Sequence, residues 1–305
     1  MTEKALNMPA VAVKKKHWTW TTPQIILGLI IFIFSMICLL PFINILAISL
    51  SSKSAILRGA VSFWPVEFET TAYSVLFNDS SMIRSLFMTV GMTVVYTVIA
   101  MFLTILMAYP LTKKRLRGRN FFSFLALFTM YFSGGVVPHY VNMLDLGLYN
   151  TIWSLILPAA ISTYYMIILK SFFSSLPESL EEAATIDGAN DFQILVRIYL
   201  PLSLASLATI TLFYAVFRWN RFDDALYYIQ DRNLYPLQLK LYNAIKNTQQ
   251  VDLTAMQEGS TAVANNISQS IESATIIFAT LPILVVYPFV QRYFVSGVTI
   301  GAVKG

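Results

Sequence analysis

The sequence is poor in charged residues, cysteine and histidine. Only 12% of its 305 residues are charged and 56% are hydrophobic, whereas soluble domains carry about twice that charge. A single cysteine, Cys38, excludes a disulfide framework, and two histidines, His17 and His139, are too few for a structural metal site. Because Phe and Tyr contribute 22 and 16 residues, the chain is not disordered. This composition indicates an integral membrane protein.

Signatures of catalysis are also missing. The chain has no Gly-Lys dipeptide and hence no P-loop for nucleotide phosphates, and it has neither His-Glu-x-x-His nor Gly-x-Ser-x-Gly. We therefore expect no catalytic residue, no cofactor or metal bound by this chain, and no enzymatic activity. The net charge of +5 comes from basic residues beside apolar runs, which indicates membrane topology and not a nucleic-acid partner.

Six apolar runs approach the length of about 20 residues that a helix needs to cross a membrane. They cover Ile25–Ile48, Ile83–Tyr109, Phe121–Val137, Thr151–Leu169, Leu202–Phe217 and Ala274–Gln291. None of them alternates polar and apolar residues, so helices are the better interpretation. The sequence predicts an all-α, polytopic membrane protein with six transmembrane helices and one domain over residues 1–305. Prolines at positions 110, 158, 282 and 288 predict kinks in the second, fourth and sixth spans.

The basic residues predict the orientation. Five of the seven positions Lys113–Arg119 are basic, whereas Pro138–Asn150 has no Lys or Arg. Under the positive-inside rule both termini are cytoplasmic, including an N-terminal segment over residues 1–24, and the chain lies in the cell membrane in contact with lipid. Two long connections follow: a cytoplasmic loop over residues 170–201 and an external loop over residues 218–273. We interpret Lys113–Arg119 as a topology anchor.

The cytoplasmic loop carries signals for two short helices. Ser175 to Glu178 has the form of a capping box with an early proline, so a helix is expected to begin there. Gly188 is placed to end it, and Asn190 or Asp191 is placed to cap a second helix over Phe192–Tyr199. Carboxylates outnumber basic residues in this loop, which indicates a neighbour other than lipid headgroups. A capped amphipathic helix lying on the bilayer is the alternative.

The same loop resembles a known family motif. Glu182-Ala183-Ala184, three residues, Gly188, nine residues and then Ile198-Tyr199-Leu200-Pro201 is similar to the E-A-A loop of binding-protein-dependent ABC importer permeases. The flanking residues and the Phe217–Asn220 stretch resemble the carbohydrate-uptake branch, the relatives of the maltose-transporter permeases. The resemblance implies the type I ABC importer permease fold, with a cytoplasmic coupling helix between spans 4 and 5.

The resemblance also implies partners and a function. The chain would be the permease subunit that translocates an oligosaccharide delivered by an external solute-binding protein. It would pair with a second related permease and with two ATPase subunits, which bind ATP and Mg. The residues implied to dock on the ATPase are Glu182, Ala183, Ala184, Asp187 and Gly188. The long external loop would reach into the docked binding protein, or else form an ordered lid.

Polar uncharged and aromatic residues are candidates for a sugar pathway, because aromatic faces stack on pyranose rings. They are Tyr131, Asn142, Tyr164, Tyr165, Tyr214, Arg218, Trp219 and Asn220, of which Trp219-Asn220 is the strongest pair. The alternative is an aromatic belt at the membrane interface. A secondary, ion-coupled transporter is the alternative function, but the six runs contain no Asp, Glu or Lys, and such carriers keep ionisable residues at mid-membrane.

Overall fold

The computed structural model describes residues 22–246 and 265–302, with side chains over 22–246 and 269–288. Within these ranges the chain is helical, and its β-structure is one isolated bridge between Ser51 and Phe68. The predicted N-terminal segment lies almost wholly outside the described residues. The all-helical prediction is confirmed.

Three helices are long and apolar enough to cross a membrane. They are α1 (Thr22–Ser49), α4 (Ser80–Ala108) and α15 (Asn265–Ala302). The short η1 (Pro110–Thr112) extends α4. At about 1.5 Å per residue each exceeds the hydrocarbon thickness of about 30 Å. These helices contain the first, second and sixth predicted spans, apart from Tyr109 at the end of α4.

Two other helix pairs are sharply bent. The first joins α5 (Arg119–Tyr131) to α6 (Val136–Asp145) at 111°. The helix predicted over Phe121–Val137 therefore ends early. Gly135, with φ +87°, precedes α6, a backbone conformation that interrupts a right-handed helix.

The second bend, of 83°, precedes the fifth predicted span. Here α10 (Asp191–Ile194), the π-helical turn η2 (Leu195–Tyr199) and α11 (Leu200–Leu202) lead into α12 (Leu204–Asn220). The break falls at Ser203, so α12 begins two residues later than predicted and ends three residues later. Counting each bent pair as one span gives at most five spans among the described residues.

The fourth predicted span is not one helix. The stretch Thr151–Leu169 contains α7 (Trp153–Ile156), an unwound segment over residues 157–162, and the start of α8 (Thr163–Ser174). Pro158 lies in this segment, and the Ser162 hydroxyl accepts a hydrogen bond from the Tyr165 amide at 3.4 Å. The prediction of a continuous helix is wrong here, because the unwound segment separates α7 from α8. α8 alone spans about 18 Å.

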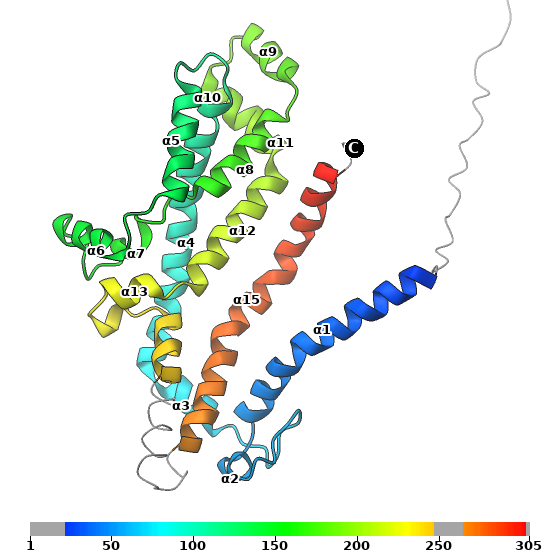
Figure 1. Ribbon diagram of the computed structural model, residues 1–305, viewed down its shortest axis with the longest axis vertical. Coiled ribbons are helices and arrows are strands. Elements are labelled where there is room, and N and C mark those ends of the chain that lie inside the picture. The colour runs from blue at the N-terminus through cyan, green and yellow to red at the C-terminus, as the bar shows by residue number, and fades with distance from the viewer. Residues whose placement is uncertain (1–21, 247–264, 303–305) are drawn as a thin grey trace, which may run out of the picture.

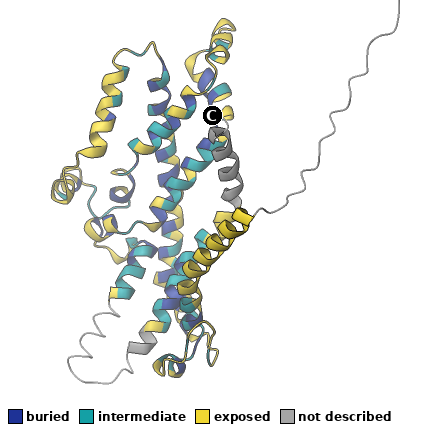
Figure 2. Cartoon of the chain, turned by 45° about the vertical axis from the view of Figure 1, so that its right-hand side comes forward, coloured by how far each residue is buried: buried dark blue, intermediate teal, exposed yellow. Residues whose placement is uncertain are grey.

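Packing centres on α4, which runs through most of the height of the molecule (Figure 1). One core lies between α4, α8 and α12, and includes Tyr96, Met166 and Ile210. A second core joins α15 to α3 (Thr71–Asn78) through Leu76 and Ala279. By contrast α1 packs on α15 chiefly near its own C-terminal end, and the rest of α1 is exposed (Figure 2).

Connecting segments gather at both ends of the molecule, while α6 and α7 lie at an intermediate height (Figure 1). α9 (Glu178–Ile186) and α10 lie at one end, and α2 (Lys53–Leu57) and α3 lie at the other (Figure 1). Beside α2, the Glu67 carboxylate accepts hydrogen bonds from two serine hydroxyls and an arginine. The predicted long loop contains α13 (Asp223–Tyr228), η3 (Arg232–Leu234) and a helix over 237–246. α15 already begins at Asn265, inside that predicted loop.

Candidate functional site

The E-A-A motif lies on α9, a nine-residue helix with no buried residue. Its start at Glu178 is as predicted, but the predicted capping box is wrong. Ser175 is the C-cap of α8, so its backbone is helical, and its hydroxyl donates to the Phe172 carbonyl at 2.8 Å. Pro177 stands at the N-cap of α9 without a side-chain cap, and Glu178 and Glu181 follow in the first turn, where carboxylates favour a helix N-terminus.

A tight turn separates α9 from α10, as predicted. Gly188 has φ +81°, and its amide donates to the Thr185 carbonyl at 3.1 Å, the left-handed ending for which glycine is suited. Asn190 caps α10 through a complete capping box. Its side-chain oxygen accepts a hydrogen bond from the Gln193 backbone amide, and the Gln193 side-chain oxygen accepts one from the Asn190 backbone amide, both at 2.9 Å. The predicted helix–turn–helix is confirmed.

This helix–turn–helix presents a mixed surface. Glu182, Ala183, Asp187 and Gly188 are exposed, whereas Ala184 is half-buried against the core. Two large apolar side chains are also uncovered: Ile186 is 86% exposed, and Phe192 is 70% exposed. Apolar side chains beside an uncovered short helix form a surface suited to a protein partner.

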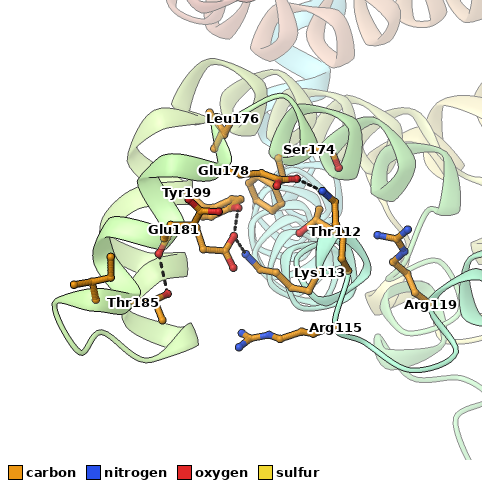
Figure 3. A pocket seen from close by; sticks show the side chains of 14 residues that line it. Thr112, Lys113, Arg115, Arg119, Ser174, Leu176, Glu178, Glu181, Thr185 and Tyr199 are labelled. Carbon is orange, nitrogen blue, oxygen red and sulfur yellow. Dashed lines mark hydrogen bonds and ion pairs between the residues drawn. The ribbon is translucent and has the colours of Figure 1, made fainter.

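The loop formed by residues 113–119, here called the basic loop, binds the acidic residues of this segment. Lys113 pairs with Glu181 at 2.6 Å, Lys114 with Glu178 at 2.6 Å, and Arg115 with Asp191. The acidic segment therefore has a basic neighbour within the same chain (Figure 3). Sequence reasoning treated the two loops separately, and their opposite charge was the signal that would have paired them.

Lys113 is the buried member of the basic loop. Its ammonium lies 4.2 Å from the ring centroids of both Tyr109 and Tyr199, and the Tyr199 hydroxyl donates to the same Glu181 oxygen at 2.7 Å. We call Tyr109, Lys113, Glu181 and Tyr199 the Lys113 cluster. Burial raises the pKa of Glu181, but hydrogen bonds from Lys113 and Tyr199 outweigh it and leave that pKa below its ordinary value.

One groove adjoins these elements, and a second lies apart from them. The first, of about 860 Å³, lies beside the Lys113 cluster between the basic loop and α9 (Figure 3). The second, of about 520 Å³, is apolar, is formed by α4, α12 and α15, and includes Val90, Phe213, Trp219 and Tyr287. Among the residues that the structure describes, no three His, Cys, Asp or Glu side chains gather in a way that would hold a metal.

Three of the eight candidate pathway residues, Tyr214, Arg218 and Trp219, are buried along α12. The Tyr214 hydroxyl bonds to the Thr104 hydroxyl at 2.7 Å and accepts from the Ser162 amide at 3.0 Å. Trp219 is 7% exposed and donates from Nε1 to the Ala279 carbonyl at 3.2 Å. These contacts join α12 to α4, to the unwound segment and to α15.

Arg218 is the third buried pathway residue, with no exposed surface. Its guanidinium pairs with Asp224, which is 4% exposed, and donates to the Leu155 carbonyl at 2.7 Å and to the Arg221 carbonyl at 3.1 Å. Removing a charge from water is costly unless it is paired and hydrogen-bonded, and most donors of Arg218 meet this condition. Sequence reasoning did not anticipate Asp224 as its partner.

Three further candidates lie on the surface. Tyr131 and Tyr164 are 76% and 56% exposed, and Asn220 is exposed with its side-chain amide donating to Val216 of its own helix. The structure therefore does not gather the six residues in one place. Of the remaining candidates, Asn142 is exposed and Tyr165 packs against Phe213, with ring centroids 5.7 Å apart.

Similarity to known proteins is extensive. Residues 80–300 match the family described as binding-protein-dependent transport system inner membrane component. The polygalacturonan/rhamnogalacturonan transport system permease protein YtcP of Bacillus subtilis is 42% identical over 274 residues, covering 89% of this chain and 94% of that protein. Protein LplC of the same organism is 43% identical over 269 residues, covering 88% of this chain and 90% of that protein.

Solved structures agree with these matches. A chain of a bacterial ABC transporter involved in the import of the acidic polysaccharide alginate has a TM-score of 0.79 and 35% identity, covering 90% of this chain and 99% of that chain. A second alginate transporter chain, from a complex with a pentasaccharide-bound periplasmic protein, has a TM-score of 0.55 and 16% identity, covering 88% and 94%, and supports the fold alone. The chain belongs to the binding-protein-dependent transport system inner membrane components, as the transmembrane permease subunit of an ABC importer and not a catalytic subunit.

Proposed function

We propose that this permease translocates an oligosaccharide delivered by an external solute-binding protein, and that ATP hydrolysis on separate ATPase subunits drives it through α9. The observation that carries the proposal is the uncovered helix–turn–helix of α9 and α10, in which Glu182 and Ala183 of the E-A-A motif are exposed. A second related permease and two ATPase subunits would complete the transporter, and ATP and Mg would be bound by those subunits.

The substrate class is supported by the relatives. YtcP is named for polygalacturonan and rhamnogalacturonan, and the structural neighbour at 35% identity belongs to an importer of alginate. Both names refer to acidic polysaccharides. Oligosaccharides of this class are therefore the first substrates to test, beside the arabinooligosaccharides named for a relative at 26% identity.

We infer six spans with α9 on the cytoplasmic side. The three ion pairs hold the basic loop against the α9–α10 segment, so both occupy the same side of the membrane, and the positive-inside rule makes that side cytoplasmic. The C-terminal end of α15 points toward the same end of the molecule (Figure 1). This supports a cytoplasmic C-terminus, with α1, α4, α5, the broken α7–α8, α12 and α15 as crossings.

Docking on the ATPase is assigned to Glu182, Ala183, Ala184, Asp187 and Gly188. Glu182 would supply a polar contact, Ala183 would allow close approach, and Gly188 would set the angle between the two helices. Motion of the docked helix would then turn the spans outward.

The docking proposal is tested by the double variant Glu182→Lys, Gly188→Pro. We expect loss of uptake and loss of ATPase subunits from the purified complex, with normal membrane insertion. Asp145→Lys, an equivalent charge reversal on exposed α6, is the matched control and should transport normally. Normal uptake by the double variant would refute coupling through α9.

Within the pathway set, we propose that the exposed Tyr131, Tyr164 and Asn220 contact sugar, whereas Tyr214, Arg218 and Trp219 position α12. Tyr164→Ala and Asn220→Ala should each raise the sugar concentration needed for half-maximal uptake while leaving the amount of assembled transporter unchanged. Unchanged uptake kinetics in both variants would contradict this assignment.

A further inference from the structure

A lysine is buried where the core helix α4 meets the α9–α10 segment. The side chain of Lys113 is 9% exposed, whereas those of its neighbours Lys114 and Arg115 are 76% and 62% exposed. Lysine is rarely buried unless it is paired. Its position directly after η1 places this charge at the very end of the α4 rod.

The contacts of Lys113 join three parts of the chain. Its ammonium binds Glu181 in the first turn of α9, at 2.6 Å, and lies against the rings of Tyr109 and Tyr199, each at 4.2 Å. Tyr199, at the end of η2, donates to the same Glu181 oxygen. The end of α4, the start of α9 and the approach to α12 therefore meet at one ammonium and one carboxylate.

The surface beneath the ammonium is tightly packed. The rings of Tyr109 and Tyr199 meet edge to face with centroids 5.1 Å apart, and Phe173 of α8 meets Tyr199 at 5.5 Å in the same manner. The Tyr109 hydroxyl also donates to the Asp191 carbonyl at 3.1 Å. Packed rings of this kind hold one geometry, so the ion pair sits on a rigid base.

The two neighbouring ion pairs cannot replace this joint. Lys114–Glu178 and Arg115–Asp191 have all four side chains more than half exposed. Water and salt screen such pairs, and they contribute little to holding two elements together. The polar connection between α4 and α9 thus depends mainly on Lys113 and Glu181.

We propose that Lys113 is a positioning residue that makes α9 and α4 move as one body during transport. The covalent chain joins α9 to α8 and, through α10, to α12, but it gives α9 no direct link to α4. The Lys113–Glu181 pair supplies that link, so a displacement of α9 also reaches the helix around which the core is packed. This inference rests on the proposed coupling through α9.

The test measures the distance between α4 and α9 in the assembled transporter. Spin labels are placed at Leu106→Cys on α4 and Ser179→Cys on α9, both exposed positions, after Cys38→Ser. Distances are recorded by electron paramagnetic resonance without nucleotide and after trapping with ADP and vanadate. With Lys113 intact, the distance should stay within about 2 Å between the two states.

Lys113→Met keeps the length of the side chain but removes its charge, and Glu181→Gln keeps an acceptor for Tyr199. In both variants we expect the distance to change by about 5 Å on trapping or its distribution to broaden. Import per ATP hydrolysed, measured with a labelled oligogalacturonide and with a labelled alginate oligosaccharide, should fall about tenfold for whichever is taken up. Lys114→Met, on the exposed pair, is the control and should match the unsubstituted chain in both measurements.

In the charge swap Lys113→Glu with Glu181→Lys, the change of the α4–α9 distance on trapping should be smaller than in Lys113→Met. A general folding defect would not allow this recovery. If the α4–α9 distance in Lys113→Met does not change on trapping, the proposal is overturned. It is also overturned if that distance changes on trapping while import per ATP hydrolysed is undiminished. Failure of the coupling proposal is recognised separately, because Glu182→Lys, Gly188→Pro would then import normally whatever the distance between α4 and α9.

Discussion

Breaking the buried ion pair between Arg218 and Asp224 should destabilise the permease more than most single substitutions. In Asp224→Asn the guanidinium of Arg218 keeps its bonds to the Leu155 and Arg221 carbonyls but loses its counter-charge. Since neither side chain of the pair is more than 5% exposed, water cannot solvate the guanidinium in place of the lost carboxylate. Leaving one partner of a buried pair uncompensated costs about 3–5 kcal/mol.

This loss converts to a measurable shift. At roughly 2 °C per kcal/mol for a chain of this length, the melting temperature should fall by about 6–10 °C. The assay is thermal unfolding of the purified transporter in detergent. Asp223→Asn is the matched control, because Asp223 pairs with Arg221 at 3.0 Å but is 53% exposed, and such pairs contribute at most about 1 kcal/mol.

A double variant decides whether the effect belongs to the pair. The destabilisation of the double variant Arg218→Met, Asp224→Leu is compared with the sum of the destabilisations of Arg218→Met alone and Asp224→Leu alone. If the double variant loses less than this sum, the two charges are coupled, as the structure requires. A melting temperature for Asp224→Asn within about 1 °C of the unsubstituted chain would refute the reasoning, because a buried charge would then have lost its partner without cost.

Three further predictions concern pH and backbone strain. Because the pKa of Glu181 is lowered, the stabilisation that its carboxylate contributes is complete above its ordinary pKa and is lost as pH falls through the lowered value. The α4–α9 label distance should therefore stay constant from about pH 8 to about pH 5. A change of that distance near neutral pH would contradict this. Hydrogen bonds from serine hydroxyls and an arginine lower the pKa of Glu67 to about 2, so its carboxyl should react with carbodiimide at about pH 5 more slowly than the exposed carboxyl of Glu69, as measured by mass spectrometry. Gly188→Ala places a side chain at φ +81°, which should cost about 1 kcal/mol and lower the melting temperature by about 2 °C; Gly188→Asn should cost less, and equal losses would argue against backbone strain.

Helix existence was predictable where a single run of apolar residues decides it. α1, α4 and α15 each contain a long apolar run, so their existence follows from the requirement of the membrane, although α15 covers 38 residues and extends well beyond the predicted run Ala274–Gln291. Proline was a less reliable guide. Pro158, where only a kink was predicted, lies in a fully unwound segment, whereas Pro282 and Pro288 lie within α15, which continues to Ala302. Neighbouring helices and local side chains can compensate for a missing amide, and the sequence does not show where they will.

The site was predictable where its geometry is local. Gly188 and Asn190 end one helix and start another through contacts within four residues, which a sequence motif can express. The ion pair of Lys113 and Glu181 joins positions 68 residues apart, so it depends on how the helices pack. The burial of Tyr214 and Arg218 depends on the same packing, whereas the sequence analysis could name both only as candidates for the sugar pathway.

The unwound segment over residues 157–162 divides the stretch from α7 to α8 into two mechanical parts. α7, before it, is tied through the Leu155 carbonyl to Arg218 at the far end of α12, whereas α8, after it, continues directly into the E-A-A segment. Within the gap, the Ala159 carbonyl and the Ser162 amide are held by the hydroxyls of Tyr96 and Tyr214. A rigid rod would tilt as a whole when one of its ends is pushed. The stretch from α7 to α8 can instead pivot at the unwound segment, where two tyrosine hydroxyls hold the backbone, so that α8 swings while α7 keeps its place.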